Sequence, residues 1–247
     1  DSGIVDVRKH LARLRRSLAE VGIPEPHTEE EFLGILMELV RRNDVDEGFL
    51  YLHVTRGVAE RNYVPVAGLT PTVFGFTQPL QGAPAHAEPA GLTMSSQPDL
   101  RWARRDVKTT NLLGQVLANW GASEAGADEA LLVASDGTVT EGGAVSFFPV
   151  VGGALLVRPL SNDILPGVTR STLLEVLEAE GIPIDERTYR LDEALAADEA
   201  MITGASSYVE PIVAIDGQAI GAGEPGALTL HLRTAYLALV RSRLHPD

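Results

Sequence analysis

The stretch DVKTTNLL, residues 106–113, organises the rest of the chain, because it places a single lysine, Lys108, ahead of a helix-periodic run. Thr109 or Thr110 can cap a helix that begins here, since a side-chain hydroxyl satisfies a free N–H group of a first turn. The positive end of the helix dipole disfavours a charged ammonium. Only the neutral amine attacks a carbonyl, so the position suits a nucleophile. Taken alone, the stretch is explained more simply by a solvated lysine at a helix start.

Length and composition describe a globular protein and exclude several kinds of site. The 247 residues suffice for one large domain or two smaller ones. The chain has 20 basic and 34 acidic residues, a net charge of −14, which argues against a nucleic-acid surface. No apolar run reaches the ~18 residues of a membrane helix. The sequence has no cysteine and its histidines lack metal-site spacing, so we expect neither disulfides nor a metal.

The first part of the chain, residues 1–79, is typical of a small α/β domain. Residues 1–7 look like the end of a hairpin. Two amphipathic helices and two strands follow. An apolar stripe marks the first helix (Leu11, Leu14, Leu18, Val21), and a capping box of Thr28 with Glu31 begins the second. Alternation of aromatic or β-branched residues with other residues marks the strands at 49–55 and 72–77. Residues 80–91, rich in Pro, Ala and Gly, are the predicted interdomain linker.

The second part, residues 92–247, is expected to be a strand-rich α+β domain with helices packed outside. Its hairpin turns are the strongest local signals: Asp136-Gly137, Gly152-Gly153 and Asp216-Gly217. We expect the remaining strands at residues 92–95, around Trp102, within 129–157, at 200–203 and at 211–215. Three helices are expected as well. The first has an apolar stripe (Leu112, Leu113, Val116, Leu117, Trp120), the second runs from Gly167 to about Glu180, and the third spans residues 226–244.

Four stretches are too polar or too rich in glycine for the elements they interrupt. They are Lys108, the carboxylate and two glycines of residues 140–143, the helix-opening turn of residues 164–170, and the small-residue loop of residues 203–207. Glycines admit another group close to the backbone, and the two later stretches offer N–H groups to an anion. A Schiff-base lysine, a carboxylate for the ring nitrogen and cradles for a phosphate are what pyridoxal 5′-phosphate requires. Each stretch alone also fits an ordinary turn or helix start.

The chain resembles the fold-type IV pyridoxal-phosphate enzymes, and within them the D-amino acid transaminases most closely. The resemblance runs over nearly the whole chain and is carried by HLARL (10–14), LHVTRG (52–57), RWARRDVKTTNLL (101–113), DGTVTEGG (136–143), ILPGVTR (164–170) and ITGASS (202–207). It implies an α+β fold of two domains, in which residues 1–79 form the small N-terminal α/β domain and residues 92–247 a large cofactor-binding pseudo-barrel.

The resemblance also implies a role for individual residues. Lys108 forms the Schiff base with pyridoxal 5′-phosphate, and Glu141 contacts the pyridine nitrogen. Arg13, in the H-x-x-R-L helix, binds the cofactor phosphate. The other cofactor-binding positions are those of the ring contact (Leu165), the helix start (Gly167, Val168, Thr169) and the small-residue loop (Ala205, Ser206).

Departures from the family pattern bear on these expectations. Arg61-Asn62-Tyr63 stands where these transaminases carry Arg-x-His, which grips the substrate carboxylate from the neighbouring subunit. The resemblance thus implies a homodimer in which Arg61 and Tyr63 reach the other subunit's site. Ala205 replaces a threonine of the phosphate loop, and residues 143–146 offer fewer hydroxyls than usual. About thirty-five to forty residues of the family's first strands are expected to be missing upstream of Asp1.

The implied activity is transamination in two half-reactions. A D-amino acid, D-alanine or D-glutamate, leaves its amino group on the cofactor and departs as a keto acid. A second keto acid, 2-oxoglutarate or pyruvate, then takes the group up. Lys108 serves as general base and general acid. The expected partners are these small molecules, with no membrane and no nucleic acid, in the cytoplasm.

Other activities of the same fold and cofactor stay open. One is transamination of branched-chain L-amino acids or of (R)-amines, and another is elimination from aminodeoxychorismate. Arg61 after the VTRG strand favours D-amino acids over these. A cofactor carrier or a catalytically inactive relative is a further alternative, against which the intact Lys108 and Glu141 argue.

Overall fold

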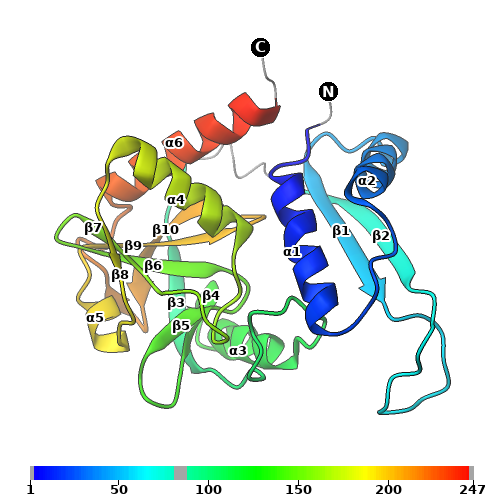
Figure 1. Cartoon of the computed structure of the whole chain (residues 1–247). Helices are drawn as coiled ribbons and strands as arrows, with labels where there is room; N and C mark the ends of the chain where they lie inside the picture. The colour runs from blue at the N-terminus through cyan, green and yellow to red at the C-terminus, as the bar shows by residue number, and fades with distance from the viewer. Residues whose placement is uncertain (1–2, 81–87, 245–247) are drawn as a thin grey trace. The chain divides into compact units, whose positions relative to one another are not determined.

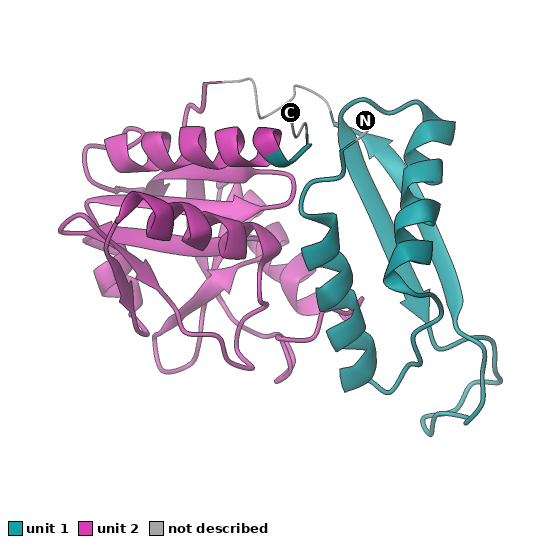
Figure 2. Ribbon diagram, turned by 45° about the horizontal axis from the view of Figure 1, so that its top comes forward, with its two compact units in different colours: residues 1–83, 243–247 teal, residues 84–242 magenta. Residues whose placement is uncertain are grey.

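The computed structural model describes residues 3–80 and 88–244, which separate into two compact units (Figures 1 and 2). One unit is formed by residues 1–83 with 243–247, and the other by residues 84–242. The predicted linker, residues 80–91, falls largely on residues 81–87, which lie outside the described residues. No helix of the described residues is long and apolar enough to cross a membrane.

The first unit is two helices packed on a two-stranded antiparallel ribbon. The apolar stripe of α1 (Val7–Glu20) and the buried Phe32 and Leu36 of α2 (Glu29–Asn43) meet one face of β1 (Gly48–Thr55) and β2 (Thr72–Pro79). The predicted capping box begins α2: Thr28 Oγ1 accepts from the Glu31 N–H at 3.3 Å, and Glu31 Oε2 accepts from the Thr28 N–H at 2.8 Å. These two helices and two strands confirm the predictions for residues 11–77.

The chain start differs from its prediction. Residues 1–2 lie outside the described part, and Val5 and Asp6 form a turn rather than the end of a hairpin. Asp6 has a left-handed backbone conformation, φ 49°, which aspartate tolerates better than most residues. The turn leads directly into α1, so no strand forms here.

The second unit is built on one mixed sheet that curls into a half-barrel (Figure 1). Among the described residues the strands run in the order β5-β4-β3-β10-β9-β6-β7-β8, with β11 paired to β10. Their bounds are β3 Leu92–Pro98, β4 Glu129–Val133, β5 Val139–Gly142, β6 Ser146–Val151, β7 Ala154–Val157, β8 Ile184–Glu186, β9 Glu199–Gly204, β10 Tyr208–Ile215 and β11 Gln218–Ala219. This arrangement confirms the α+β class and the strand-rich pseudo-barrel.

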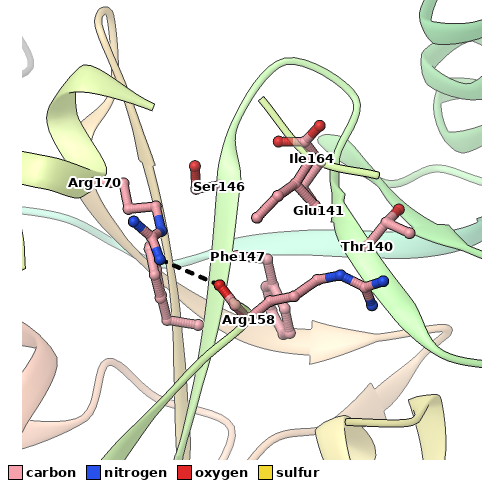
Figure 3. Close-up of a pocket in the computed structure, with 8 residues that line it drawn as sticks. Thr140, Glu141, Ser146, Phe147, Arg158, Ile164 and Arg170 are labelled. Atoms are coloured by element: carbon pink, nitrogen blue, oxygen red, sulfur yellow. Dashed lines mark hydrogen bonds between the residues drawn. The ribbon is translucent and has the colours of Figure 1, made fainter. Parts of the chain in front are cut away.

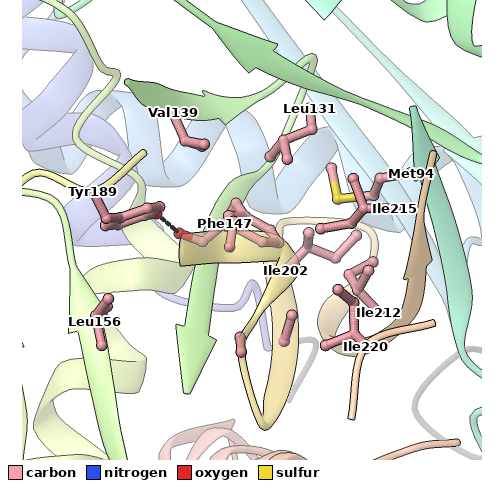
Figure 4. Packing of buried hydrophobic residues seen from close by; sticks show 13 residues of the cluster. Met94, Leu131, Val139, Phe147, Leu156, Tyr189, Ile202, Ile212, Ile215 and Ile220 are labelled. Carbon is pink, nitrogen blue, oxygen red and sulfur yellow. Dashed lines mark hydrogen bonds between the residues drawn. The ribbon is translucent and has the colours of Figure 1, made fainter. Parts of the chain in front are cut away.

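Helices lie outside this sheet, as the sequence predicts. They are α3 Leu113–Glu124, α4 Val168–Glu180, α5 Leu191–Leu195 and α6 Ala227–Leu244. α3 packs against β3 and β4, and α4 packs against β9. Apolar residues from both halves of the sheet form the main core, with Phe147 and Ile202 at its centre (Figure 4). Tyr189 closes one end, where its hydroxyl donates to the Phe147 carbonyl at 2.9 Å.

Two predictions around the central lysine are wrong. The segment around Trp102 is a bent loop rather than a strand, and α3 has Leu112 as its N-cap rather than Thr109 or Thr110. Thr109 Oγ1 instead accepts from the Asn111 N–H at 3.3 Å, within the loop. The apolar stripe of α3 is also not its buried face, because the alanines on the other side pack against β3 and β4. The exposed stripe is Leu112, Leu113, Val116, Leu117 and Trp120.

Candidate active site

Glu141 is the buried carboxylate on which the site of the second unit is built. It lies near the end of β5, all four residues of which are buried, and its side chain is 7% exposed. Oε1 accepts hydrogen bonds from the Arg101 guanidinium and from the Leu165 N–H, the latter at 3.1 Å. Among the described residues Oε2 accepts none. The structure therefore brings the predicted Glu141 and Leu165 together and leaves one carboxylate oxygen available.

Arg101 is a site residue that the sequence reasoning missed. Its side chain is 4% exposed and lies between two carboxylates, those of Glu141 and Asp99. Burial raises the pKa of Glu141, and the positive charge of Arg101 opposes that rise. Burial would also raise the pKa of Asp99, but the hydrogen bonds and charge of Arg101 outweigh it and hold this pKa below its ordinary value. A charge-rich loop sequence normally indicates a solvated surface, so only its position seven residues before Lys108 hinted at a role.

A small cavity adjoins Glu141 (Figure 3). Two buried arginines lie in its wall. Arg158 donates to the Val139 carbonyl at 2.6 Å, and Arg170 donates to the Arg158 carbonyl at 3.2 Å. Burial lowers the pKa of Arg170. The full lining is Thr140, Glu141, Ser146, Phe147, Phe148, Arg158, Ile164 and Arg170.

The start of α4 forms an anion cradle beside this cavity. Gly167 is the N-cap and offers no side chain to the first turn, so the N–H groups of a helix start are left for another partner. A Cβ on Gly167 would lie 2.8 Å from Ser146 Oγ, so glycine is needed for this close approach. Val168 and Thr169, both predicted cofactor contacts, are the first buried residues of the helix.

Two buried hydroxyls lie on β9 and in the turn that follows it. Thr203 Oγ1 and Ser207 Oγ have no hydrogen-bond partner among the described residues. Thr203 is paired with Ser146 across β9 and β6, and Ser207 ends the turn that contains the predicted Ala205 and Ser206. An unsatisfied buried hydroxyl is costly unless a ligand occupies it. The donors present therefore fit a phosphate group, and the small polar residues around Gly204 were the signal in the sequence.

Lys108 lies apart from this cavity wall. It is an exposed residue of the loop between β3 and α3, held between the buried Val107 and the half-buried Thr109. It lies four residues before the N-cap Leu112, so the helix dipole does not act on it as the sequence argument supposed. It does not line the cavity beside Glu141. Its loop nevertheless reaches that carboxylate through Arg101.

The backbone at the glycines after Glu141 is approached closely by other groups of the protein. The Gly143 N–H donates to Glu129 Oε1 at 3.1 Å, and a Cβ there would lie 2.2 Å from Asn119 Oδ1. Burial raises the pKa of Glu129. The close approach expected from the sequence is therefore real, but at Gly143 the approaching groups come from β4 and α3.

The remaining predicted residues lie in the first unit. Arg13 is half-buried on α1, where its guanidinium is 3.5 Å from His10 Nδ1. Arg61 and Tyr63 lie in the loop between β1 and β2. The Arg61 guanidinium donates to the Tyr63 hydroxyl at 3.0 Å and lies 5.0 Å from the ring centroid. Both are exposed, Tyr63 by 88%, so the pair is brought together on a surface.

Comparison with known proteins identifies relatives over most of the chain. The model of the family "Amino-transferase class IV" matches residues 1–215. A D-alanine aminotransferase of Bacillus licheniformis is 41% identical over 227 residues, which cover 92% of this chain and 80% of that protein. One of Staphylococcus haemolyticus is 33% identical over 244 residues, covering 98% and 86%.

Solved structures agree with the fold. The branched-chain amino acid aminotransferase of Thermobaculum terrenum in the PLP form has a TM-score of 0.87 at 26% identity, covering 97% of this chain and 79% of that one. The branched-chain amino acid aminotransferase of Escherichia coli has a TM-score of 0.86 at 22% identity, covering 98% and 81%, and at this identity the likeness shows the fold alone.

Proposed function

The chain belongs to the class IV aminotransferases, and from this premise we propose that it transfers the amino group of a D-amino acid to a 2-keto acid. The observation that carries the proposal is the 41% identity to a D-alanine aminotransferase over 92% of the chain. D-Alanine and D-glutamate are the proposed donors, and pyruvate and 2-oxoglutarate the acceptors.

Aminotransferases of this class use pyridoxal 5′-phosphate, and the site has groups that fit it. When bound, the cofactor supplies an aldehyde for the amine and a ring that withdraws electrons. Lys108 would hold the aldehyde end and Glu141 Oε2 the ring nitrogen. The start of α4 with Thr203 and Ser207 would hold the phosphate. Arg13 is a further proposed phosphate ligand. Leu165, Ala205 and Ser206 would line the cofactor.

Lys108 and Glu141 divide the proton chemistry. The Nζ of Lys108 would accept the proton from the α-carbon of the amino acid and later return a proton, so one residue would be base and then acid. Glu141 Oε2 would accept a hydrogen bond from the ring nitrogen and so favour its protonated form.

Arg61 and Tyr63 are the proposed carboxylate-binding pair. Arg61 would donate charge-assisted hydrogen bonds to the α-carboxylate of the substrate, and Tyr63 would orient the guanidinium through the contact that it already makes. We place this pair in the site of the neighbouring subunit of a homodimer. The division into a small domain, a linker and a large cofactor domain, and a location in the cytoplasm, are parts of the same proposal.

A branched-chain substrate is the second candidate, because the Thermobaculum terrenum neighbour above is named a branched-chain amino acid aminotransferase. Its identity to this chain is 26%, below the 41% and 33% of the two D-alanine aminotransferases. Arg61, retained where the D-amino acid enzymes have an arginine, also favours the D-amino acid.

A steady-state assay separates the two candidates. The full chain, loaded with pyridoxal 5′-phosphate, is supplied with 2-oxoglutarate and either D-alanine, L-alanine or L-leucine, and keto-acid formation is measured. D-Alanine is expected to be the fastest donor. Faster turnover of L-leucine would replace the proposal with the branched-chain candidate, and no turnover of any donor would refute both.

A further inference from the structure

The two oxygens of the Glu141 carboxylate have different surroundings. Oε1 accepts both hydrogen bonds, from Arg101 and from the Leu165 N–H, whereas Oε2 accepts none from the described residues. A protonated ring nitrogen is an N–H donor and needs an acceptor with an open lone pair. One oxygen of Glu141 is thus fixed to the protein, and the other is available to a ligand.

Arg101 does not depend on Glu141 for its position. Nε donates to Asp99 Oδ1 at 2.9 Å and Nη2 donates to Asp99 Oδ2 at 2.8 Å, a two-point contact that fixes the plane of the guanidinium. The Asp99 side chain is fully buried. Thr140, next to Glu141 on β5, donates its hydroxyl to Asp99 Oδ2 at 2.7 Å. Asp99 therefore holds Arg101 in place from the side opposite to Glu141.

Other charged groups near Glu141 have their own partners. Arg158 faces the cavity but binds the Val139 carbonyl and Asp163, and Arg170 binds the Arg158 carbonyl. Tyr189 lies buried behind them, and burial raises its pKa well above the ordinary value, so it stays neutral. Within the described chain, Arg101 is the cation in contact with the Glu141 carboxylate.

We propose that Arg101 is a positioning residue, which keeps Glu141 ionised and fixes it through Oε1 so that Oε2 alone is offered to the cofactor ring. Asp99 fixes Arg101 and limits the pull of its charge on Glu141. The inference rests on the proposed function for the identity of the group that Oε2 binds. The electrostatic effect of Arg101 on Glu141 is a property of the protein without cofactor and can be measured there.

The first experiment titrates Glu141 in the cofactor-free protein. Glutamate labelled with ¹³C at the side-chain carboxyl is followed by NMR against pH, and Glu141→Gln assigns the signal. In Arg101→Gln we expect the pKa of Glu141 to rise by about one unit or more, because an opposite charge in contact shifts a carboxyl by that order. In Arg101→Lys the charge remains, so the rise is smaller.

Asp99→Asn is expected to shift the pKa of Glu141 in the opposite direction from Arg101→Gln. Without the Asp99 charge, Arg101 attracts Glu141 more strongly, so the pKa of Glu141 falls. General loosening of the structure would move both variants in the same direction, which separates an electrostatic role from a merely structural one. Arg104→Gln is the matched control: Arg104 is on the same loop and binds Asp106 at 2.9 Å, and the Glu141 titration is expected to stay unchanged. An unchanged Glu141 titration in Arg101→Gln, or shifts of equal sign, would overturn the proposal.

The second experiment uses the cofactor-loaded protein. Arg101→Gln should lower kcat for D-alanine by about tenfold or more with a smaller change in KM, and shift the pH dependence of the cofactor's visible absorption. Arg101→Lys should recover part of kcat. If the wild-type protein binds cofactor but transaminates no D-amino acid, the proposed function fails while the cofactor-free titration still decides the effect of Arg101. Should Arg101→Gln not fold, Arg101→Lys and Asp99→Asn give the two opposite shifts that the proposal requires.

Discussion

At the scale of the residue, three charged side chains share one buried region of the second unit, and the proposed chemistry depends on them. Asp99, Arg101 and Glu141 form a row of alternating charge in which the central arginine is nearly inaccessible. A buried ion pair compensates its desolvation only when further hydrogen bonds satisfy the remaining polar atoms. Here Thr140 and the Leu165 N–H supply them, and Oε2 of Glu141 is left without a hydrogen bond from the described part of the chain.

The Asp99 carboxylate makes the free energy of unfolding depend on pH in the acid range. Its pKa in the folded protein is lowered, so its contribution is present above the pKa of an unfolded aspartate and is lost as the pH falls through the folded value. We expect Asp99→Asn to lower the free energy of unfolding at pH 7 by about 3 kcal/mol and to flatten its decline below about pH 4. Urea denaturation at a series of pH values measures this. Asp46→Asn, at an exposed loop carboxylate, is the control, and equal pH curves for wild type and Asp99→Asn would contradict the assignment.

Arg61 carries the prediction for the substrate. Arg61→Ala should raise KM for D-alanine by about tenfold or more, because removing a charged hydrogen bond to a carboxylate costs on the order of 1.5–3 kcal/mol. Tyr63→Phe should have a smaller effect, since the guanidinium keeps its charge. Arg41→Ala, at an exposed helix arginine of the same unit, serves as control. An unchanged KM in Arg61→Ala would mean that another group binds the carboxylate.

At the scale of the element, the turn after β5 shows how the sheet and α3 hold Glu141. A Cβ at Gly143 would lie 2.2 Å from Asn119 Oδ1 and 2.7 Å from Glu129 Oε1, so both side chains would have to shift and Glu129 would lose its hydrogen bond from the Gly143 N–H. Gly143→Ala should therefore lower the free energy of unfolding by about 2 kcal/mol, as overpacking typically does. Gly34→Ala is the control, since a Cβ at Gly34 of α2 would meet nothing within 4 Å.

The control is expected to leave stability unchanged or to raise it by up to about 1 kcal/mol, because alanine favours a helix over glycine. Chemical denaturation of wild type and both variants measures these changes in the free energy of unfolding. If Gly143→Ala were as stable as wild type, the approach of Asn119 and Glu129 to the turn would not be as tight as described.

Elements with local signals could be predicted from the sequence, and elements without them could not. The capping box at Thr28 marked the start of α2, and α4 ends at the predicted Glu180, next to the left-handed Gly181. α3 begins later than Thr109 and Thr110 suggest, because the Thr109 hydroxyl accepts from the Asn111 N–H within the preceding loop and Leu112 is the N-cap. β8 spans three residues and depends on pairing with β7, which no local pattern reveals.

The residues of the candidate site also divide into those that a sequence motif predicts and those that no motif predicts. Glu141, the start of α4 and the loop after β9 follow from motifs, whereas Arg101 and Asp99 meet Glu141 only through the sheet, forty residues away in sequence. Thr203 and Ser207 are ordinary small polar residues in the sequence, and only the fold shows that their hydroxyls are buried with no partner among the residues that the structure describes. A single sequence gives little information about which polar side chains the tertiary fold buries.

At the scale of the whole molecule, the exposed stripe of α3 is one apolar surface of the described residues that the single chain does not cover. Apolar residues gather there, including Trp120 at 62% exposure. Contiguous exposed apolar surface is typical of a protein interface. In the proposed homodimer this stripe is expected to be covered by the second subunit.

Trp120→Glu tests the assembly. A buried charge at an interface costs several kcal/mol, so the variant should be monomeric at a concentration at which the wild type sediments as a dimer. Val151→Glu, at an exposed apolar residue at the end of β6, should leave the dimer intact. A wild-type monomer, or a dimeric Trp120→Glu, would place the interface elsewhere or remove it.

The most direct test of the central claim is a single turnover without any keto-acid acceptor. The chain, loaded with pyridoxal 5′-phosphate, is mixed with excess D-alanine or L-alanine, and pyruvate is measured per subunit together with the cofactor's visible absorption. The proposal predicts about one pyruvate per subunit from D-alanine, loss of the visible band, far slower reaction with L-alanine, and no reaction in Lys108→Ala. Faster conversion of L-alanine, or an undiminished reaction in Lys108→Ala, would contradict it.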